Sequence, residues 1–305
     1  MRKLRSEEEL VSNWVGDINK PVVSICCVTY NHNEFLEDAL EGFLNQDTDF
    51  PFELIIHDDA STDGTTDIVM EYAKKYPSII KPIVQTENQF SKASLLFPRL
   101  VLPKAIGKYI ALCDGDDYWT DNKKLQMQID FLEGNLEYVI TYSDCQSFDD
   151  TGHLDIDLGG ATRDLDSEEL MKSTPIYTMT SCFRNVIKTI PQDLMAARYG
   201  DLVMWSLLGS YGRGKYLSDI KPTAYRIHGG GVHSTKNKRH RAMMQLITYS
   251  SLLAYYQRLS NDKLSRYFME KIFKSCIQMT GILFIGKYII NTFSLKLARM
   301  MGIER

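Results

Sequence analysis

Three carboxylates crowd into four residues of the stretch "ALCDGDDYW", directly after an apolar run. Asp114, Asp116 and Asp117 repel one another there unless a cation or strong hydrogen-bond donors compensate their charge. Oxygen ligands suit Mg²⁺ or Mn²⁺, and Mg²⁺ usually takes one or two protein carboxylates together with substrate phosphates. The loop therefore predicts either a metal bound with a phosphorylated ligand or a solvated turn that caps the helix beginning near Asp121.

A second acidic loop, "HDDASTDGTTD", follows another apolar run. Residues 61–65 have the composition of a turn that leads into a helix, with Thr62 or Asp63 as the cap. Asp58 and Asp59 precede this turn, where two adjacent carboxylates can accept hydrogen bonds from a nucleobase imide or a ribose hydroxyl. Taken by itself, this loop leaves capping and ligand binding both open.

The apolar pattern predicts the elements that position these loops. Short runs rich in β-branched residues predict strands at 22–28, 52–57, 79–84 and 108–113. Helical spacing between them predicts helices at 35–44, 68–76 and 94–105. Asn33 is predicted to cap the first helix, Pro82 to place its strand at an edge or irregular position, and Cys26 and Cys27 to face opposite sides of the sheet. The alternation predicts an α/β fold with a mostly parallel sheet flanked by helices, which binds ligands where its strands end.

The rest of the chain is predicted to extend this domain and to end in helices. A helix capped by Asp121 and a strand near 138–145 follow, and the polar segment 149–173 is interpreted as a variable loop. A helix near 200–212, two strand-like runs and the glycine-rich "GGGVHST" come next. From about residue 237 the pattern is helical, which predicts a C-terminal helical appendage packed on the α/β domain.

Composition excludes several classes of protein. With a net charge of −4 over 305 residues, the chain has no general basic field, so no nucleic acid partner is expected. The six cysteines form no C-x-x-C pair, and the basic-then-acidic N-terminus lacks the apolar core of a signal peptide, which predicts a cytoplasmic protein. No apolar run reaches the roughly 18 residues of a membrane-spanning helix. The cationic segment 281–305 predicts contact with a membrane surface instead.

Three ordered motifs together carry a specific resemblance: "VSICCVTYNHNEFLEDALEGFLNQ", "FELIIHDDASTDGTTDIVMEYAKKY" and "GKYIALCDGDDYWTDNKKLQMQIDFL". Over about residues 20–235 they resemble the family 2 glycosyltransferases of the Rossmann-like GT-A fold, which are inverting nucleotide-sugar transferases. The resemblance implies an N-terminal extension at 1–20 and a GT-A domain at 21–235, followed by a helical region at 236–305. Within the domain it implies a nucleotide-binding half at 21–120 and an acceptor half at 121–235.

The resemblance also assigns roles to residues of the first two loops. It implies that Thr29, Tyr30 and Asn31 line the nucleotide base. It further implies that Asp58 hydrogen-bonds the base, with Asp59 beside it. The base would thus lie across the ends of the first two strands.

The stretch "DGDD" resembles the D-x-D element of the family. Asp114 is then expected to face the ribose or donor sugar, and Asp116 to bind the metal that bridges the two phosphates. Asp117 is expected behind the metal ligand or against the sugar. Gln85 and Asn88, in "QTENQFSK", fall where the family often places polar residues on the donor side.

The acceptor half is expected to supply the base that an inverting displacement needs opposite the leaving diphosphate. Asp201, in "RYGDLVMW", resembles the acceptor-side aspartate of the family, and an ordinary helix N-cap is the alternative. His228, in "AYRIHGGGVHST", resembles the histidine that many GT-A enzymes bring to the metal or diphosphate, with Arg226 and His233 as secondary candidates. The consecutive glycines predict a loop that closes over the donor.

These expectations describe an inverting, metal-dependent glycosyltransferase that uses Mn²⁺ or Mg²⁺. The expected donor is a nucleotide diphosphate sugar, with UDP favoured, and the expected acceptor is a glycan or polyisoprenyl-diphosphate-linked glycan of bacterial capsule or O-antigen synthesis. The expected location is the cytoplasm, with the C-terminal helices in peripheral contact with the inner face of the cytoplasmic membrane. The alternatives are a non-catalytic nucleotide-sugar-binding module and a metal-dependent nucleotidyltransferase, although "TYNHNE" lacks the basic phosphate-cradling signature of the latter.

Overall fold

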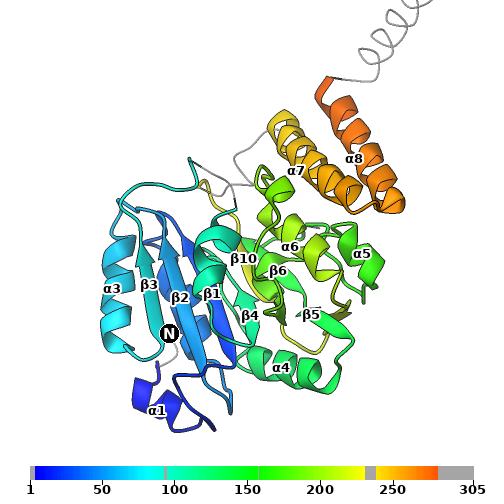
Figure 1. The fold of residues 1–305 in the computed structure, drawn as a ribbon. Helices are drawn as coiled ribbons and strands as arrows, with labels where there is room; N and C mark the ends of the chain where they lie inside the picture. The colour runs from blue at the N-terminus through cyan, green and yellow to red at the C-terminus, as the bar shows by residue number, and fades with distance from the viewer. Residues whose placement is uncertain (1–3, 93–94, 157, 231–237, 281–305) are drawn as a thin grey trace, which may run out of the picture.

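Seven strands form the main sheet of the computed structural model, which describes residues 4–92, 95–156, 158–230 and 238–280 (Figure 1). In spatial order they are β3 (Ile80–Val84), β2 (Phe52–Asp58), β1 (Val23–Thr29), β4 (Tyr109–Leu112), β8 (Cys182–Arg184), β5 (Tyr138–Tyr142) and β9 (Arg213–Tyr216). The first four run parallel, β8 runs antiparallel to both its neighbours, and β9 runs parallel to β5. The predicted mostly parallel α/β sheet is confirmed, and β3 with Pro82 lies at its edge as predicted.

A smaller sheet and the helices surround the main sheet (Figure 1). The smaller sheet contains, in spatial order, β10 (Thr223–Arg226), β6 (Cys145–Asp149) and β7 (Gly152–His153). The α-helices are α1 (Glu7–Val11), α2 (Leu36–Leu44), α3 (Thr65–Lys75), α4 (Lys124–Gly134), α5 (Ser167–Met171), α6 (Gly200–Leu208), α7 (Lys238–Arg258) and α8 (Asp262–Thr280). Shorter helical turns are the π-helix η1 (Phe97–Val101) and the 3-10 helices η2 (Leu102–Lys104), η3 (Thr178–Thr180) and η4 (Gln192–Leu194).

The strands divide their side chains between two cores, one on each face of the sheet. In β1, Ile25 and Cys27 pack into the core that contains the buried residues of α2, α3 and α4. Cys26 packs into the other core, with buried residues of α6, α7 and α8. Successive strand residues point to opposite faces, so the prediction for Cys26 and Cys27 is confirmed, as are helices on both faces. All six cysteines are free thiols.

Two predicted helix caps are wrong. Asn33 does not cap α2, whose N-cap position is occupied by Phe35 without a side-chain hydrogen bond. Asn33 instead donates from Nδ2 to the Asp63 carbonyl (2.7 Å), which joins the two loops after β1 and β2. Asp121 precedes the N-cap of α4 by two residues and accepts hydrogen bonds from the backbone of Lys123 and Lys221, both at 3.0 Å. The side chains of Asn33 and Asp121 thus link loops and do not cap the start of a helix.

Two further segments differ from prediction for local reasons. The helix predicted at 94–105 contains η1 and η2 in place of an α-helix, because Pro98 and Pro103 lack the N–H groups that regular α-helical hydrogen bonds require. The polar segment 149–173 contains β7 and α5. A capping box begins α5, in which Asp166 and Glu169 each accept from the other's backbone N–H. This signature was present in the sequence.

The described C-terminal helices pack on the α/β domain (Figure 1). Leu252 and Tyr256 of α7 and Leu264 and Phe268 of α8 are at most 1% exposed, and all belong to the second core. The Tyr256 hydroxyl also pairs with Ser206 Oγ at 2.8 Å. The predicted appendage is therefore confirmed up to residue 280, and the predicted membrane-surface segment 281–305 lies outside the described residues. Among the described helices, none is long and apolar enough to cross a membrane.

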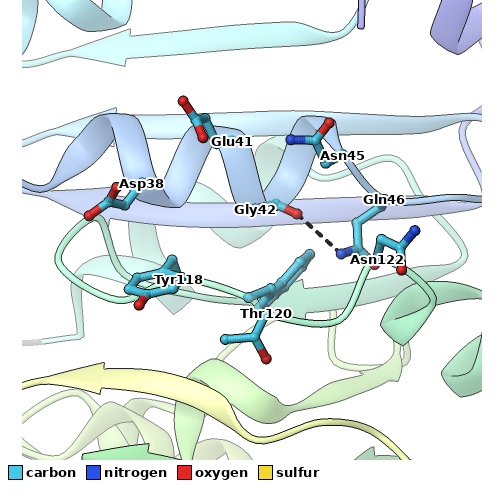
Figure 2. Close-up of a pocket in the computed structure, with 9 residues that line it drawn as sticks. Asp38, Glu41, Gly42, Asn45, Gln46, Tyr118, Thr120 and Asn122 are labelled. Atoms are coloured by element: carbon cyan, nitrogen blue, oxygen red, sulfur yellow. Dashed lines mark hydrogen bonds between the residues drawn. The ribbon is translucent and has the colours of Figure 1, made fainter. Parts of the chain in front are cut away.

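The loop after β4 is held against α2 at close range (Figure 2). A Cβ atom on Gly42 would lie 2.9 Å from the backbone nitrogen of Trp119, so this approach requires glycine. The Gln46 side chain donates to the Asp121 carbonyl (2.8 Å) and accepts from the backbone of α4 (3.0 Å). A pocket of about 240 Å³ lies beside this contact, between α2 and residues 118–122 (Figure 2). Its described lining contains none of the predicted site residues.

Lys124 of α4 allows a pH test of this packing. Its side chain is 1% exposed, donates to Gln128 Oε1 (2.7 Å) and lies 4.4 Å from the centroid of the Trp119 ring. Burial lowers the pKa of Lys124 to about 8. An unfolded lysine has a pKa of about 10.4. Between about pH 8 and 10 the unfolded state therefore binds more protons than the folded state, so the free energy of unfolding rises with pH in that window.

We therefore expect the wild type to gain about 2 kcal/mol of unfolding free energy relative to Lys124→Met between pH 7 and pH 9.5. Urea unfolding of both proteins at the two pH values measures this difference, in which the other titrating groups cancel. Parallel pH dependence of the two proteins would contradict the lowered lysine pKa.

Candidate active site

The loop after β4 brings the acidic cluster to the edge where β1 and β4 end. The Gly115 N–H donates to the Val28 carbonyl at 2.9 Å. A Cβ atom on Gly115 would lie 2.7 Å from Thr29 Oγ1 and 3.2 Å from His32 Nδ1, so the approach depends on glycine. The acidic loop therefore crosses directly over the end of β1, as expected for a ligand site of a parallel sheet.

Asp116 is the centre of a cluster that could hold a metal ion. Its Oδ2 lies 3.1 Å from His228 Nε2 and 3.7 Å from His32 Nε2. One ligand atom of each of these three residues lies within 4.8 Å of the others. The predicted metal residues Asp116 and His228 are thus together. His32 was not predicted, although "TYNHNE" follows a strand at the same sheet edge.

The donor set of this cluster fits a divalent cation. Ligand atoms about 2.1 Å from a cation stand roughly 3.0–3.5 Å from one another, and the separations around Asp116 lie in or beside that range. Carboxylate oxygen suits Mg²⁺ and Mn²⁺, whereas imidazole nitrogen suits transition metals. Phe35 packs against the His228 ring, with the ring centroids 4.7 Å apart. The cluster is therefore walled on one side by an apolar ring.

The neighbouring aspartates repel one another as the sequence suggests. Burial, together with the charges of Asp116 and Asp201, raises the pKa of Asp114 to about 7. Burial and the charge of Asp116 raise the pKa of Asp117 well above its usual range. Burial is the largest single influence on Asp116 and disfavours its charge, but the hydrogen bond with His228 and the charges of His32 and His228 together outweigh burial, so the pKa of Asp116 is lowered. A cation beside Asp116 would relieve this repulsion.

Asp114 is accessible to water although protein surrounds it closely enough to raise its pKa. Both conditions hold for a group on the floor of a concave site. Asp117 differs, since it is only 4% exposed and its Oδ1 accepts from the Arg226 N–H at 2.8 Å. Of the two, Asp114 is the carboxylate that a ligand can reach.

Arg226, a secondary candidate from the sequence, serves the loop itself. Its Nε donates to the Asp116 carbonyl (3.0 Å) and its terminal nitrogen pairs with Asp38 of α2 (2.6 Å). The guanidinium lies 4.7 Å from the centroid of Phe35 and 4.6 Å from that of Phe148. Arg226 therefore clamps the acidic loop between α2 and β6. The other secondary candidate, His233, and residues 231–237 of the glycine-rich loop lie outside the described residues.

Asp58 and Asp59 turn their carboxylates into the chain's own loops. Asp58, which is fully buried, accepts from Ser61 Oγ at 2.5 Å and from the Thr66 hydroxyl. Asp59 is 1% exposed and accepts from the backbone N–H groups of residues 89 and 90 at 2.7 and 3.0 Å. Asn88 donates to the Asp59 carbonyl (3.3 Å) and accepts from the residue 91 N–H (2.8 Å). These groups organise the loops after β2 and β3, in contrast to the direct base contact expected of Asp58.

The loop after β1 exposes two of its three predicted base-lining residues. Thr29 is 1% exposed, with its hydroxyl against Gly115, whereas Tyr30 is 44% exposed. Asn31 adopts a left-handed backbone (φ 54°), which asparagine tolerates. Its N–H donates to Ser61 Oγ (2.9 Å) and its Oδ1 accepts from the residue 62 N–H (2.8 Å). Tyr30 and Asn31 thus remain the residues of this loop available to a base.

Asp201 lies in the first turn of α6, near the acidic cluster. It is the second residue of the helix, so the alternative that it is the N-cap is wrong, because Tyr199 occupies that position. The charge of Asp201 acts on Asp114, which places the two carboxylates near one another. The N–H groups of Arg198 and Tyr199 donate to Thr248 Oγ1 of α7 at 3.0 and 3.1 Å. The helical appendage therefore holds the segment that leads into Asp201.

Several known proteins resemble this chain in sequence. The family described as glycosyl transferase family 2 matches residues 24–189. TuaG of Bacillus subtilis, a teichuronic acid biosynthesis glycosyltransferase by name, is 30% identical over 75% of this chain and 86% of its own length. WfaP of Escherichia coli, named as a UDP-Glc:alpha-D-GlcNAc-diphosphoundecaprenol beta-1,3-glucosyltransferase, is 28% identical over 76% of this chain and 85% of its own length. An uncharacterised protein of Mycobacterium tuberculosis is 34% identical over 72% of this chain, which spans 63% of the mycobacterial protein.

Solved structures share the fold at low sequence identity. TarS 1–349 of S. aureus in complex with UDP-GlcNAc has a TM-score of 0.58 at 18% identity and covers 85% of this chain and 73% of its own. The mannosyltransferase PcManGT of Pyrobaculum calidifontis, solved with GDP-Man and Mn²⁺, has a TM-score of 0.53 at 17% identity and covers 93% and 83%. The fold is thus the GT-A fold of glycosyltransferases. Because the family match covers more than half of the chain and TuaG is 30% identical over most of it, the chain belongs to glycosyl transferase family 2.

The close approach at Gly115 predicts a stability effect. Gly115→Ala should lower the free energy of unfolding by about 1–3 kcal/mol, because the new Cβ must displace Thr29 or His32 in a packed site. Gly134→Ala is the matched control, since a Cβ there meets nothing within 4 Å. Urea unfolding of the wild type and of both variants measures the change in the free energy of unfolding. Equal stability of the two variants would contradict the crossing of the acidic loop over β1.

The contact at Thr248 predicts a local change ahead of Asp201. Thr248→Val keeps the side-chain shape but removes the acceptor of two N–H groups, so hydrogen exchange at residues 198–199 should accelerate at least about tenfold. Thr248→Ser should restore slow exchange. Ser251→Ala is the control on the same helix, because the Ser251 hydroxyl donates only locally, to the Ile247 carbonyl (3.1 Å). Exchange in Thr248→Val as slow as in the wild type would refute the coupling.

Proposed function

We propose that this family 2 glycosyltransferase is an inverting enzyme that moves a hexosyl group from a nucleotide diphosphate sugar to a glycan or lipid-linked glycan in bacterial surface polysaccharide synthesis. One observation carries the proposal: the loop that holds the cluster at Asp116 also holds Asp114, whose carboxyl group is affected by the charge of a further carboxylate, Asp201 in the first turn of α6. Inverting transfer needs these two functions together, since the leaving diphosphate requires charge compensation and the acceptor hydroxyl requires a base.

The donor is proposed to bind over the half of the domain at residues 21–120. Tyr30 and Asn31 contact its base, and Asp58 and Asp59 hold the loops around it through their backbone and hydroxyl partners. Asp114 faces the ribose or the sugar. TarS was solved with UDP-GlcNAc and PcManGT with GDP-Man, and the name of WfaP specifies UDP-Glc, which supports a nucleotide sugar with UDP as the first nucleotide to test.

Asp116 and His228 are proposed to hold the metal, Mn²⁺ or Mg²⁺. A cation bound there would neutralise the charge that develops on the departing diphosphate. Asp117 and Arg226 keep Asp116 in place through the 2.8 Å bond at the Arg226 N–H and the 3.0 Å bond to the Asp116 carbonyl. The presence of Mn²⁺ in the PcManGT structure supports metal dependence.

Asp201 is proposed to act as the catalytic base. The acceptor oxygen attacks the anomeric carbon, the bond from that carbon to the diphosphate breaks, and the acceptor proton passes to the Asp201 carboxylate. Attack opposite the leaving group inverts the configuration in one displacement. The acceptor binds over residues 121–235, where α6 presents Asp201.

The acceptor is proposed to be presented at the inner face of the cytoplasmic membrane. The name of WfaP specifies a diphosphoundecaprenol-linked acceptor, which supports a lipid-linked glycan. On α8, Met269 and Phe273 are 52% and 51% exposed, and Lys271 and Lys274 accompany them in sequence. Apolar and cationic groups together on a helix suit contact with an anionic lipid surface.

Nucleotide release tests the proposed reaction. The full chain is incubated with Mn²⁺, a panel of UDP-, GDP- and dTDP-sugars, and a polyisoprenyl-diphosphate-linked saccharide. Asp201→Asn should lower kcat by about 100- to 10,000-fold because a carboxamide cannot accept the proton, while the donor Kd changes less than threefold. Asp150→Asn, in the exposed turn after β6, should behave as the wild type.

Each other outcome of this assay has a definite meaning. Unchanged turnover in Asp201→Asn would contradict the assignment of the base. Donor binding without nucleotide release in the wild type across the whole panel would indicate a binding module. Formation of a nucleotide sugar from a nucleoside triphosphate and a sugar phosphate would indicate a nucleotidyltransferase.

A further inference from the structure

We propose that His32 is a third protein ligand of the metal and that its imidazole makes the site select Mn²⁺ over Mg²⁺. The inference rests on the proposed function, because it concerns the cation assigned there to Asp116 and His228. It adds a residue from the loop after β1 to ligands that come from the loops after β4 and β10.

The position of His32 matches a shared cation better than a direct hydrogen bond. Its Nε2 lies 3.7 Å from Asp116 Oδ2, which is beyond hydrogen-bonding range. Its ring lies 5.9 Å from the His228 ring, centroid to centroid, and at 83° to it. The ligand atoms of all three residues nevertheless lie within 4.8 Å of one another. The His32 Nε2 atom thus faces the cluster at ion-pair distance from Asp116 but makes no hydrogen bond to it.

The other ring nitrogen of His32 points to the same role. Its Nδ1 is buried and has no hydrogen-bond partner among the described residues. The neutral tautomer with hydrogen on Nδ1 leaves the Nε2 lone pair directed at the cluster. A buried N–H without a partner costs free energy, and a metal–nitrogen bond at Nε2 would offset that cost.

The loops hold His32 at this place from both sides. Its backbone N–H donates to Thr65 Oγ1 at the start of α3 (2.8 Å). The absent Cβ of Gly115 leaves room for the ring, since that atom would lie 3.2 Å from Nδ1. Phe35 stands beside the ring at 6.2 Å between centroids. The imidazole is therefore placed by β1, α3 and the acidic loop before any cation arrives.

A second imidazole determines which cation the site prefers. Mg²⁺ binds oxygen ligands at near-ideal octahedral geometry, whereas transition metals accept imidazole nitrogen readily. With Asp116 alone, the site would present one oxygen and discriminate weakly. Adding His228 and His32 gives two nitrogens and one oxygen, which favours Mn²⁺.

Metal binding without turnover tests this inference. Mn²⁺ is titrated into the metal-free full chain, without nucleotide and again with UDP, and the free ion is followed by its EPR signal. We expect His32→Gln to weaken Mn²⁺ binding roughly 10- to 100-fold and Mg²⁺ binding, measured by competition, less than threefold. His153→Gln, at an exposed histidine of β7, is the matched control and should bind Mn²⁺ as the wild type does.

Pulsed EPR of Mn²⁺ bound to the wild type provides a readout that requires no variant to fold. We expect two imidazole nitrogens coupled to Mn²⁺ in the wild type and one in His32→Gln. A single coupled imidazole in the wild type, or unchanged Mn²⁺ affinity in His32→Gln, overturns the proposal. Asp116→Asn distinguishes failure of the metal site from failure of the His32 assignment. If Asp116→Asn binds Mn²⁺ as tightly as the wild type, the metal site itself is refuted. If Asp116→Asn loses Mn²⁺ binding and His32→Gln keeps it, only the role of His32 is refuted.

Discussion

Mutual repulsion of the aspartates at the end of β4 is the constraint on which the rest of the site depends. Asp114, Asp116 and Asp117 occupy one short loop, and burial with neighbouring charge raises the pKa of Asp114 and Asp117. The chain holds this loop in place by other means: the close approach of Gly115 to β1 and the clamp of Arg226 on the backbone of Asp116. The charged forms of these carboxylates are thus disfavoured in the folded protein, and a nearby cation would stabilise them.

Residues that are distant in the sequence meet at this edge of the sheet. Arg226 and His228 come from β10 and the loop after it, and they reach Asp116 because β10 pairs with Tyr118 beside the acidic loop. Asp201 comes from α6, whose preceding segment is bound to Thr248 of α7. The helical appendage is therefore hydrogen-bonded to the segment that precedes the proposed base, so a contact made by these helices can affect the proposed acceptor side of the site.

Local patterns were sufficient to predict the sheet and the edge at which the acidic loop lies. Strand-length apolar runs and the rule that parallel strands end at one edge placed the acidic loop at that edge, whereas the proximity of His228 to Asp116, which the structure shows, was expected only from the family resemblance. Side-chain direction was beyond those patterns, which did not predict that the carboxylates of Asp58 and Asp59 accept hydrogen bonds from the chain's own loops. A strand-end position specifies where a residue lies, and the local turn decides where its carboxylate points.

The roles of His32 and Thr248 depend on tertiary contacts that the periodicity of the sequence does not indicate. His32 is one polar residue in a loop, and its proximity to Asp116 follows only from the crossing of two strand ends at Gly115. Thr248 is an ordinary threonine within a long helix, and its role comes from the docking of that helix on α6. The irregular helix at η1 and η2 could have been predicted from the sequence, because Pro98 and Pro103 disfavour a regular α-helix.

The most direct test of the account is the coupling between cation and nucleotide at Asp116. Calorimetric titration of UDP and GDP into the full chain, with and without Mn²⁺, measures it. The account predicts that Mn²⁺ tightens binding of the preferred nucleotide at least about tenfold, that this nucleotide tightens Mn²⁺ binding by the same factor, and that Asp116→Asn removes both effects. Nucleotide affinity that is the same with and without Mn²⁺, in the wild type and in Asp116→Asn alike, would contradict it.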